Sequence, residues 1–404
     1  MSSAVKDLKI IEAAESGPLL SHSETASSGT LQTARSRFPV WLTFLAVGLA
    51  LAVLVAVALT SLKRTPHNQL SPTVAVVTPS APVAIRAGEG ARLLCGSSKS
   101  GYRDRRGNEW GTDAFYSGGI ASEIAVQPIY RTRDPFLFRS MRSGEFSYKI
   151  PLKPGSYEMR LYFAETSYSP SGVMDGGENV RVFTVLLNGT PVLRNFDITA
   201  DAGPSTGDVK VFKDVGPASD GFLHLAFSKV TDVPLVNAIE IVPATPHRLR
   251  PTQIITQDNT VIDRNGITWG PDDYFLGGRT IARFGTVPGP DDPEIYARER
   301  YGNFSYAIPV AKGHYAARLH FAETFWGPEN PGGGGEGSRI FDVYCNGTAL
   351  LRNFDIFHEA GSHRQVIKTF HGLHPNAQGK LLFSFIPQIN YANVSAIEVL
   401  DETE

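Results

Sequence analysis

The stretch GNFSYAIPVAKGHYAARLHFAET, Gly302–Thr324, decides the fold of this chain. Apolar and polar residues alternate on both sides of a Lys-Gly turn, which is the period-two pattern of two strands joined by a tight connection. One face of the second strand carries Tyr315, Ala317, Leu319 and Phe321. The stretch occurs a second time, as GEFSYKIPLKPGSYEMRLYFAET at Gly144–Thr166. The chain therefore repeats a strand pair.

The repeat extends far beyond this stretch. The matching pairs are DRRGNEWGTDAFYSGG (Asp104–Gly119) with DRNGITWGPDDYFLGG (Asp263–Gly278), FTVLLNGTPVLRNFDI (Phe183–Ile198) with FDVYCNGTALLRNFDI (Phe341–Ile356), and NAIEIV (Asn237–Val242) with SAIEVL (Ser395–Leu400). The offset between copies is about 158 residues, as between Gly144 and Gly302. A period of this size indicates duplication of a whole domain, because solenoid repeats are much shorter.

Each copy predicts an antiparallel β-sandwich. Both contain Asn-Gly between apolar runs, at Asn188 and Asn346, which is a strong hairpin signal and accounts for these Asn-Gly-Thr sequences without glycosylation. No long helical period follows residue 84. The expected fold class is all-β: two tandem jelly-roll-like sandwiches, at 84–243 and 254–404, joined by a Pro- and Arg-bearing linker at 244–253. The hexapeptide LRNFDI, identical in both copies, is interpreted as scaffold.

The N-terminal region predicts a membrane anchor. Phe38–Leu62 is uncharged and apolar over a length that spans a bilayer as a helix. The tail 1–36 is predicted to be disordered and 65–83 to be an extended Pro/Ser/Thr linker. Equal numbers of basic residues lie close to the span on its two sides, so they do not set its orientation. More distant lysines on the N-terminal side favour a cytoplasmic location for the tail. We therefore expect a single-pass membrane protein with periplasmic or otherwise extracytoplasmic sandwiches, displayed on a bacterial envelope.

Composition excludes several classes of function. The formal net charge of −2 provides no basic field for nucleic acid. Cys95 and Cys345 lie in different copies at positions that do not correspond, so neither a disulfide nor a metal site is expected, and both are interpreted as core residues. Glu165 and Glu323 occupy the repeated FAET, one in each domain. Glycoside hydrolysis needs two carboxylates about 5–10 Å apart in one cleft, so a structural hydrogen bond is preferred. No cofactor and no enzymatic activity are predicted.

The repeated motifs together resemble the malectin domain. The resemblance rests on DRNGITWGPDDYFLGG, FSYAIPV, LHFAET, FDVYCNG, LRNFDI and SAIEVL in that order, and covers roughly Ile85–Pro243 and Ile254–Leu400. It implies a sandwich related to carbohydrate-binding modules and a lectin without catalytic activity. The founding animal members bind α-linked diglucosides and glucosylated N-glycan, and plant relatives form receptor ectodomains.

The resemblance implies a sugar pocket of aromatic residues and one carboxylate. In the second copy it is carried by Phe284, Tyr296, Phe325 and Trp326, with Asn390 where the acid should stand. We expect these side chains to converge in one concavity. Two alternatives stay open: Tyr296 is a core aromatic, or one of Phe325 and Trp326 points into the core because neighbours on a strand face opposite sides.

The first copy carries a different part of the pocket. Asp232 supplies the acid and Tyr168 one of the aromatic pair, whereas Ser167 replaces the other. Phe138 stands in place of Tyr296. Phe138 could equally be a core residue, and Asp232 could serve only a turn.

These expectations combine into one functional hypothesis. The chain is a membrane-anchored, non-catalytic protein that binds glucose-containing oligosaccharide or polysaccharide, and its tandem display raises avidity. The rival hypotheses are a protein-interaction or structural envelope module with decayed sugar sites, and a sensor whose tail docks a cytoplasmic partner.

Overall fold

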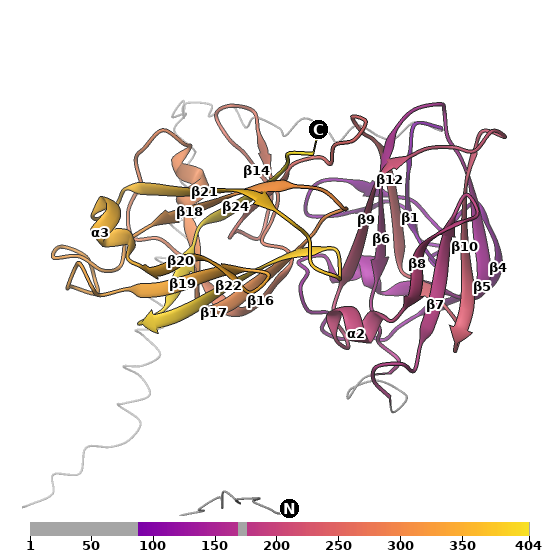
Figure 1. Cartoon of the computed structure of the whole chain (residues 1–404), viewed down its shortest axis with the longest axis horizontal. Helices are drawn as coiled ribbons and strands as arrows, with labels where there is room; N and C mark the ends of the chain where they lie inside the picture. Colours follow the sequence, from indigo (N-terminus) through magenta and orange to yellow (C-terminus); the bar gives the residue numbers. More distant parts are fainter. Residues whose placement is uncertain (1–87, 169–175, 404) are drawn as a thin grey trace, which may run out of the picture. The chain divides into compact units, whose positions relative to one another are not determined.

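The computed structural model describes residues 88–168 and 176–403, which form two β-sandwiches (Figure 1). The predicted tail at 1–36, the predicted membrane span at 38–62 and the predicted linker at 65–83 lie outside the described residues. Within the described ranges no helix is both long enough and apolar enough to cross a membrane.

The first sandwich consists of two facing antiparallel sheets. One sheet has the order β1 (Ala91–Leu94), β12 (Ala238–Pro243), β6 (Tyr157–Phe163), β9 (Asp208–Val215). The other has the order β11 (Leu235–Val236), β5 (Ser140–Pro151), β10 (Phe222–Thr231), β7 (Val182–Leu187), β8 (Thr190–Phe196), with β4 (Tyr116–Glu123) paired to β5. Figure 1 shows the two layers side by side. A small ribbon of β2 (Tyr102–Arg103) and β3 (Glu109–Trp110), a 3-10 turn η1 (Pro135–Phe138) and a short helix α2 (Ile198–Ala202) complete it.

The second sandwich repeats this plan strand for strand. Its smaller sheet has the order β13 (Thr252–Ile255), β24 (Ala396–Asp401), β18 (Tyr315–Ala322), β21 (Gln365–Leu373). Its larger sheet has the order β16 (Phe275–Ala282), β17 (Arg298–Pro309), β22 (Lys380–Ile389), β19 (Ile340–Cys345), β20 (Thr348–Phe354), with β23 (Ala392–Val394) paired to β17. The ribbon of β14 (Val261–Ile262) and β15 (Thr268–Trp269), the turn η2 (Pro293–Tyr296) and the helix α3 (Ile356–Ala360) correspond to their counterparts. The expected all-β tandem fold is confirmed.

The core of each sandwich lies between its two sheets. The face predicted for β18 is buried throughout: Tyr315, Ala317, Leu319 and Phe321. Phe304 stacks on Phe385 with ring centroids 4.5 Å apart, and the first sandwich repeats this contact with Phe146 and Phe227 at the same 4.5 Å. Both cysteines are buried and free, as expected of core residues.

The segment LRNFDI ends a strand and begins a helix in both copies. Asn195 and Asn353 adopt left-handed φ values of 47° and 50°, a conformation in which Asn is enriched. Phe196 then packs on Phe163 and Phe183, with centroids 5.0 and 5.3 Å apart. The Asp197 side chain caps α2 by accepting from backbone N–H groups of its first turn, and the corresponding aspartate caps α3. The identity of the hexapeptide therefore has a structural cause, as predicted.

The hairpin before LRNFDI also follows the prediction. Asn188 and Gly189 have φ values of 48° and 79°, and Asn346 and Gly347 have 49° and 80°. Positive φ at both central residues is the signature of the type I′ turn that Asn-Gly favours. The turn explains why this dipeptide recurs.

The predicted linker at 244–253 packs on both sandwiches. Leu249 is buried, and the guanidinium of Arg250 pairs with Glu158 of the first sandwich at 2.9 Å. A second ionic contact joins Lys380 Nζ to Asp208 Oδ1 at 2.7 Å, with both side chains buried. The two copies are thus tied by charged contacts as well as by the chain.

Candidate functional site

A cavity of about 240 Å³ opens in the second sandwich at the ends of β16 and β18. Five aromatic side chains line it: Phe284, Tyr301, Phe325, Trp326 and Tyr391. Its polar lining includes Arg283, Glu299, Arg339 and Asn390. Four residues predicted from the sequence therefore meet here: Phe284, Phe325, Trp326 and Asn390.

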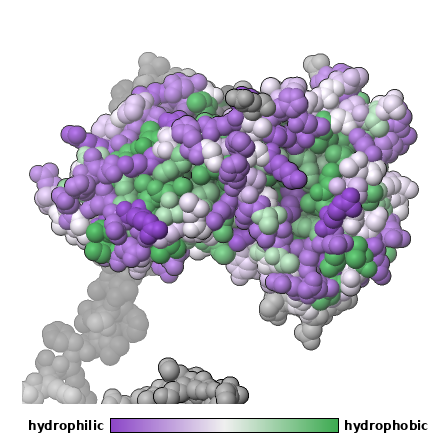
Figure 2. All heavy atoms as spheres, in the orientation of Figure 1, coloured by the Kyte–Doolittle hydropathy of each residue, from purple (hydrophilic) through white to green (hydrophobic). Residues whose placement is uncertain are grey.

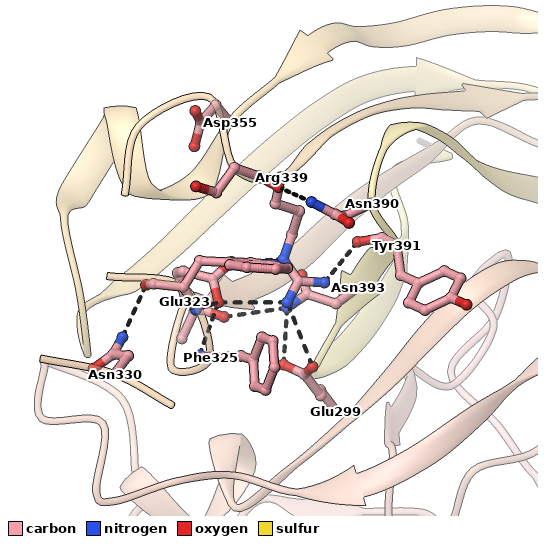
Figure 3. Close-up of polar contacts among 12 residues, drawn as sticks. Glu299, Glu323, Phe325, Asn330, Arg339, Asp355, Asn390, Tyr391 and Asn393 are labelled. Atoms are coloured by element: carbon pink, nitrogen blue, oxygen red, sulfur yellow. Dashed lines mark hydrogen bonds and ion pairs between the residues drawn. The ribbon is translucent and has the colours of Figure 1, made fainter. Parts of the chain in front are cut away.

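One wall is set by a single carboxylate just after β18. Glu323 Oε1 accepts hydrogen bonds from the backbone N–H groups of Phe325, at 2.9 Å, and Trp326, at 3.0 Å. Its other oxygen pairs with Arg339 Nε at 2.6 Å (Figure 3). This bracket turns the chain out of the strand, so the alternation rule no longer applies and both neighbouring aromatics reach the cavity. Their rings meet edge to face, with centroids 4.9 Å apart.

The remaining walls come from other strand ends. The Phe284 ring follows β16 and lies 6.0 Å from the Phe325 ring, and 41% of Phe284 is exposed. Tyr301 of β17 and Tyr391, just before β23, have centroids 5.8 Å apart. Aromatic faces exposed at a cavity suit the apolar C–H face of a sugar ring.

The floor of the cavity is a buried ionic layer. Glu299 Oε2 lies 2.7 Å from Arg283 Nη1 and accepts a hydrogen bond from Asn393 Nδ2 at 2.8 Å. Arg339 Nη1 donates to the carbonyl of Tyr391 at 2.6 Å (Figure 3). Burial lowers the pKa of Arg283, an effect that Glu299 and Glu323 oppose. The positive charges of two arginines cancel the negative charges of two glutamates, so the floor carries no net charge. These residues are Arg283, Arg339, Glu299 and Glu323.

Asn390 lies at the rim in a left-handed conformation, with φ of 54°. Its Nδ2 donates to the backbone carbonyl of Ser338 at 2.6 Å (Figure 3). That bond uses one amide donor, so the side-chain carbonyl oxygen and the other N–H are available to a ligand hydroxyl.

Two predicted residues lie elsewhere, and the expected convergence of Tyr296 with Trp326 and Asn390 is wrong. Tyr296 is only 1% exposed in the turn η2, and its hydroxyl lies 3.0 Å from His320 Nδ1 in the core. Burial and the Asp291 carboxylate raise the pKa of Tyr296. Phe138, the counterpart in the first sandwich, is equally buried and packs against Tyr162. The 3-10 turn directs both rings inward, so the core alternative holds for each.

The other predicted residues of the first sandwich bond to each other. The Tyr168 hydroxyl donates to Asp232 Oδ2 at 2.8 Å, and Arg181 Nη1 lies 3.5 Å from the same oxygen. Burial alone would raise the pKa of Asp232, but the Val233 N–H, the Tyr168 hydroxyl and Arg181 together hold it below its usual value. The Glu165 bracket is retained, with Arg181 Nε 2.6 Å from Oε2. Residues 169–175, beside Tyr168, lie outside the described ranges.

Sequence reasoning missed five aromatic or charged residues of the second cavity: Arg283, Glu299, Tyr301, Arg339 and Tyr391. Alignment of the two copies contains the signal, once the offset is taken as 159 residues at Asp104–Gly119 and as 158 residues from Gly144 onward. The backbone N–H groups of Ile124 and Arg283 make equivalent bonds, to Arg139 O and Ala297 O respectively, so these residues correspond. In the same way strand register aligns Met141 with Glu299 and Leu235 with Asn393. Three apolar residues of one copy are thus charged or polar in the other.

Comparison with known proteins identifies the family. The malectin domain model matches residues 91–239 and 252–384. The chain belongs to the malectin domain family. Malectin-A of Xenopus laevis is 32% identical over 84 residues, which are 19% of this chain and 28% of that protein. A probable receptor-like protein kinase of Arabidopsis thaliana is 25% identical over 339 residues, which cover 67% of this chain.

The match covers only part of these relatives. The chain spans 39% of the length of the receptor-like kinase. Among solved structures, the plant receptor-like kinase FER aligns with a TM-score of 0.42 at 18% identity, over 78% of this chain and 96% of that one.

Proposed function

We propose that the second sandwich binds carbohydrate in the cavity lined by Phe284, Phe325 and Trp326, without catalysis. The observation that carries the proposal is the combination of aromatic walls with a polar floor in a cavity of about 240 Å³. A pyranose ring presents apolar faces and a polar rim, which match these two kinds of surface. Other hydrophobic patches occur on both sandwiches among hydrophilic residues (Figure 2), but the cavity adds enclosure and fixed polar groups.

The ligand class that fits is a neutral, glucose-containing glycan. The two arginines and two glutamates of the floor cancel, so nothing there calls for a charged sugar. Family membership supports a lectin-type module, because the animal members are named malectin. In the first sandwich Tyr168 and Asp232 are the residues we assign to a second, weaker site.

Glycan-array binding by the purified full-length chain tests the proposal. We expect binding to neutral glucans, and its loss in a variant carrying Phe325→Ala and Trp326→Ala. The control changes Val126→Ala and Tyr130→Ala, two exposed residues of the first sandwich outside both proposed sites, and should retain the binding. A folded chain that binds no glycan would overturn the proposal and favour the protein-interaction alternative.

We also propose that Phe38–Leu62 anchors the chain in a membrane and displays both sandwiches outside the cytoplasm. The support is an uncharged apolar segment long enough to span a bilayer. Deletion of 38–62 should move the protein from the membrane fraction to the soluble fraction. Protease added to intact cells or spheroplasts should digest the sandwiches, and full protection would overturn the orientation.

A further inference from the structure

The second sandwich lacks the rim carboxylate that the first sandwich has. Asp232 and Asn390 occupy corresponding positions with the same φ of 54°, so an amide stands where the other copy has an acid. An amide is a weaker acceptor than a carboxylate for a hydroxyl donor. A site that fixes a sugar in one orientation therefore needs another strong acceptor.

Glu299 provides a carboxylate on the cavity floor. Its side chain lines the cavity and is only 6% exposed. Oε2 is engaged by Arg283 at 2.7 Å and by Asn393 at 2.8 Å, which fix the orientation of the group. An ionised carboxylate has about four acceptor positions, so these two contacts leave capacity on the other oxygen.

Among the described residues, Arg339 faces the second oxygen of Glu299 without hydrogen-bonding it. Arg339 Nη2 lies 3.9 Å from Oε1, beyond hydrogen-bond distance. The other nitrogens of Arg339 are committed, Nε to Glu323 at 2.6 Å and Nη1 to the Tyr391 carbonyl at 2.6 Å. Figure 3 shows Glu299 beside the Phe325 ring at this end of the network. A ligand hydroxyl entering the cavity can therefore reach an acceptor to which none of the described residues donates a hydrogen bond.

The first sandwich shows that the fold does not require this carboxylate. Met141 occupies the place of Glu299, Ile124 that of Arg283 and Leu235 that of Asn393. The copy with the acidic rim thus has apolar residues at these three floor positions, and the copy with the amide rim has a carboxylate, a guanidinium and an amide there. A group that only held the sandwich together would have no reason to vary inversely with the rim.

We infer that Glu299 Oε1 is the hydroxyl acceptor that orients a neutral sugar in the second sandwich, replacing the acid absent at Asn390. The inference rests on the proposed function and specifies which ligand group is recognised: a hydroxyl directed at the floor while the ring lies against the aromatic walls. Arg283 and Asn393 act as positioning residues that hold Oε2. The linkage preference of the site then follows from which hydroxyl reaches Glu299.

Binding of the disaccharides nigerose and maltose to the full-length chain, measured by calorimetry, tests the inference. Glu299→Gln should weaken binding of the preferred disaccharide about tenfold to a hundredfold, because it replaces a charge-assisted hydrogen bond. Met141→Leu, at the corresponding position of the first sandwich, is the control and should leave binding unchanged. Equal binding by wild type and Glu299→Gln would overturn the role of Glu299 while leaving the proposed function intact.

The first part of a second measurement uses only the wild-type chain, so it does not depend on how the variant folds. The wild-type chain is titrated with a series of monodeoxy analogues of the preferred disaccharide. Removal of one particular hydroxyl should weaken binding to the wild-type chain about tenfold or more. Glu299→Gln should bind that analogue and the parent disaccharide equally well. If Glu299 were purely structural, Glu299→Gln would instead weaken the binding of all analogues by the same factor. Uniform wild-type binding across the series would overturn the inference, and no wild-type binding to either disaccharide would overturn its ligand class as well.

Discussion

The two sandwiches share their frame and differ in one layer beneath the site. Both retain the glutamate of the FAET motif, which pairs with an arginine at 2.6 Å and accepts hydrogen bonds from the backbone N–H groups two and three residues farther along the chain. Beneath that bracket the second sandwich places Arg283, Glu299 and Asn393, where the first has apolar residues. Shared contacts therefore serve the fold, whereas the divergent contacts at the same depth are the ones that we propose take part in recognition.

The largest effect is expected from removing the glutamate of the bracket that both sandwiches share, Glu165 with Arg181 and Glu323 with Arg339. Glu165→Ala and Glu323→Ala should each lower the free energy of unfolding by about 3–5 kcal/mol, because each leaves a buried guanidinium without its partner. Denaturant unfolding of the full-length chain measures both. Glu109→Ala is the control: its pair with Arg103 is half exposed and should be worth less than about 1 kcal/mol. If only one of the two variants lost much of its free energy of unfolding, the bracket would not have the same structural role in both sandwiches.

Variants of the ionic layer formed by Arg283, Glu299 and Asn393 distinguish a role in stability from a role in ligand binding. Arg283→Ile alone should cost about 3–5 kcal/mol, because it leaves the buried Glu299 carboxylate without its closest cation. The triple variant Arg283→Ile, Glu299→Met and Asn393→Leu carries the residues of the first sandwich. Its stability should equal or exceed that of the wild type, since apolar replacements of buried ion pairs are often neutral or stabilising.

Two measurements on these variants decide whether the layer serves recognition. Urea unfolding compares the single with the triple variant, and glycan binding is then measured on the triple variant. A triple variant as unstable as Arg283→Ile would show that the layer is structural, and undiminished binding would show that it does not recognise ligand.

A pH dependence should distinguish the sandwiches next. His320 of β18 is buried where the first sandwich has Tyr162. Burial lowers the His320 pKa, but hydrogen bonds with Asp291 and Glu398 outweigh it and leave the pKa raised. A raised folded-state pKa stabilises the fold fully below the ordinary histidine value of about 6.5 and loses that contribution as pH rises through the folded value.

Thermal unfolding across this window provides the measurement. The transition of the second sandwich should move to lower temperature as pH rises above about 6.5, and His320→Gln should flatten this dependence. His371→Gln is the control, because His371 is an exposed residue paired with Glu402. A dependence that persists in His320→Gln would assign it to another group.

The smallest expected effect concerns the rim. Asn390→Asp gives the second sandwich the acid of the first, at a φ that Asp232 adopts in the native chain. It loses the hydrogen bond to the Ser338 carbonyl and gains a charged acceptor, so binding of nigerose or maltose should tighten by about threefold to tenfold. Calorimetry measures the change. Weaker binding would show that the amide, with its donors, is what the second site requires.

Much of the fold was predictable because its signals are local. The alternation on β18, the Asn-Gly turns and the LRNFDI capping segment each depend on near neighbours in the chain, and all are confirmed. Of the predicted site residues in the second copy, Phe284, Phe325, Trp326 and Asn390 gather at one cavity. Tyr296 does not, because whether a ring beside a strand turns inward is decided by a 3-10 turn and by packing against His320.

The sequence by itself determined the duplication, the all-β architecture and the positions where the copies differ, because periodicity and repetition are written along the chain. Only the tertiary structure decided which differences belong to one site. Arg283, Glu299, Arg339 and Asn393 are separated by up to 110 residues and meet only because the end of β16, strand β17, the start of β19 and strand β23 converge. A hydrogen bond or an ion pair depends on distances in space, which sequence spacing does not encode.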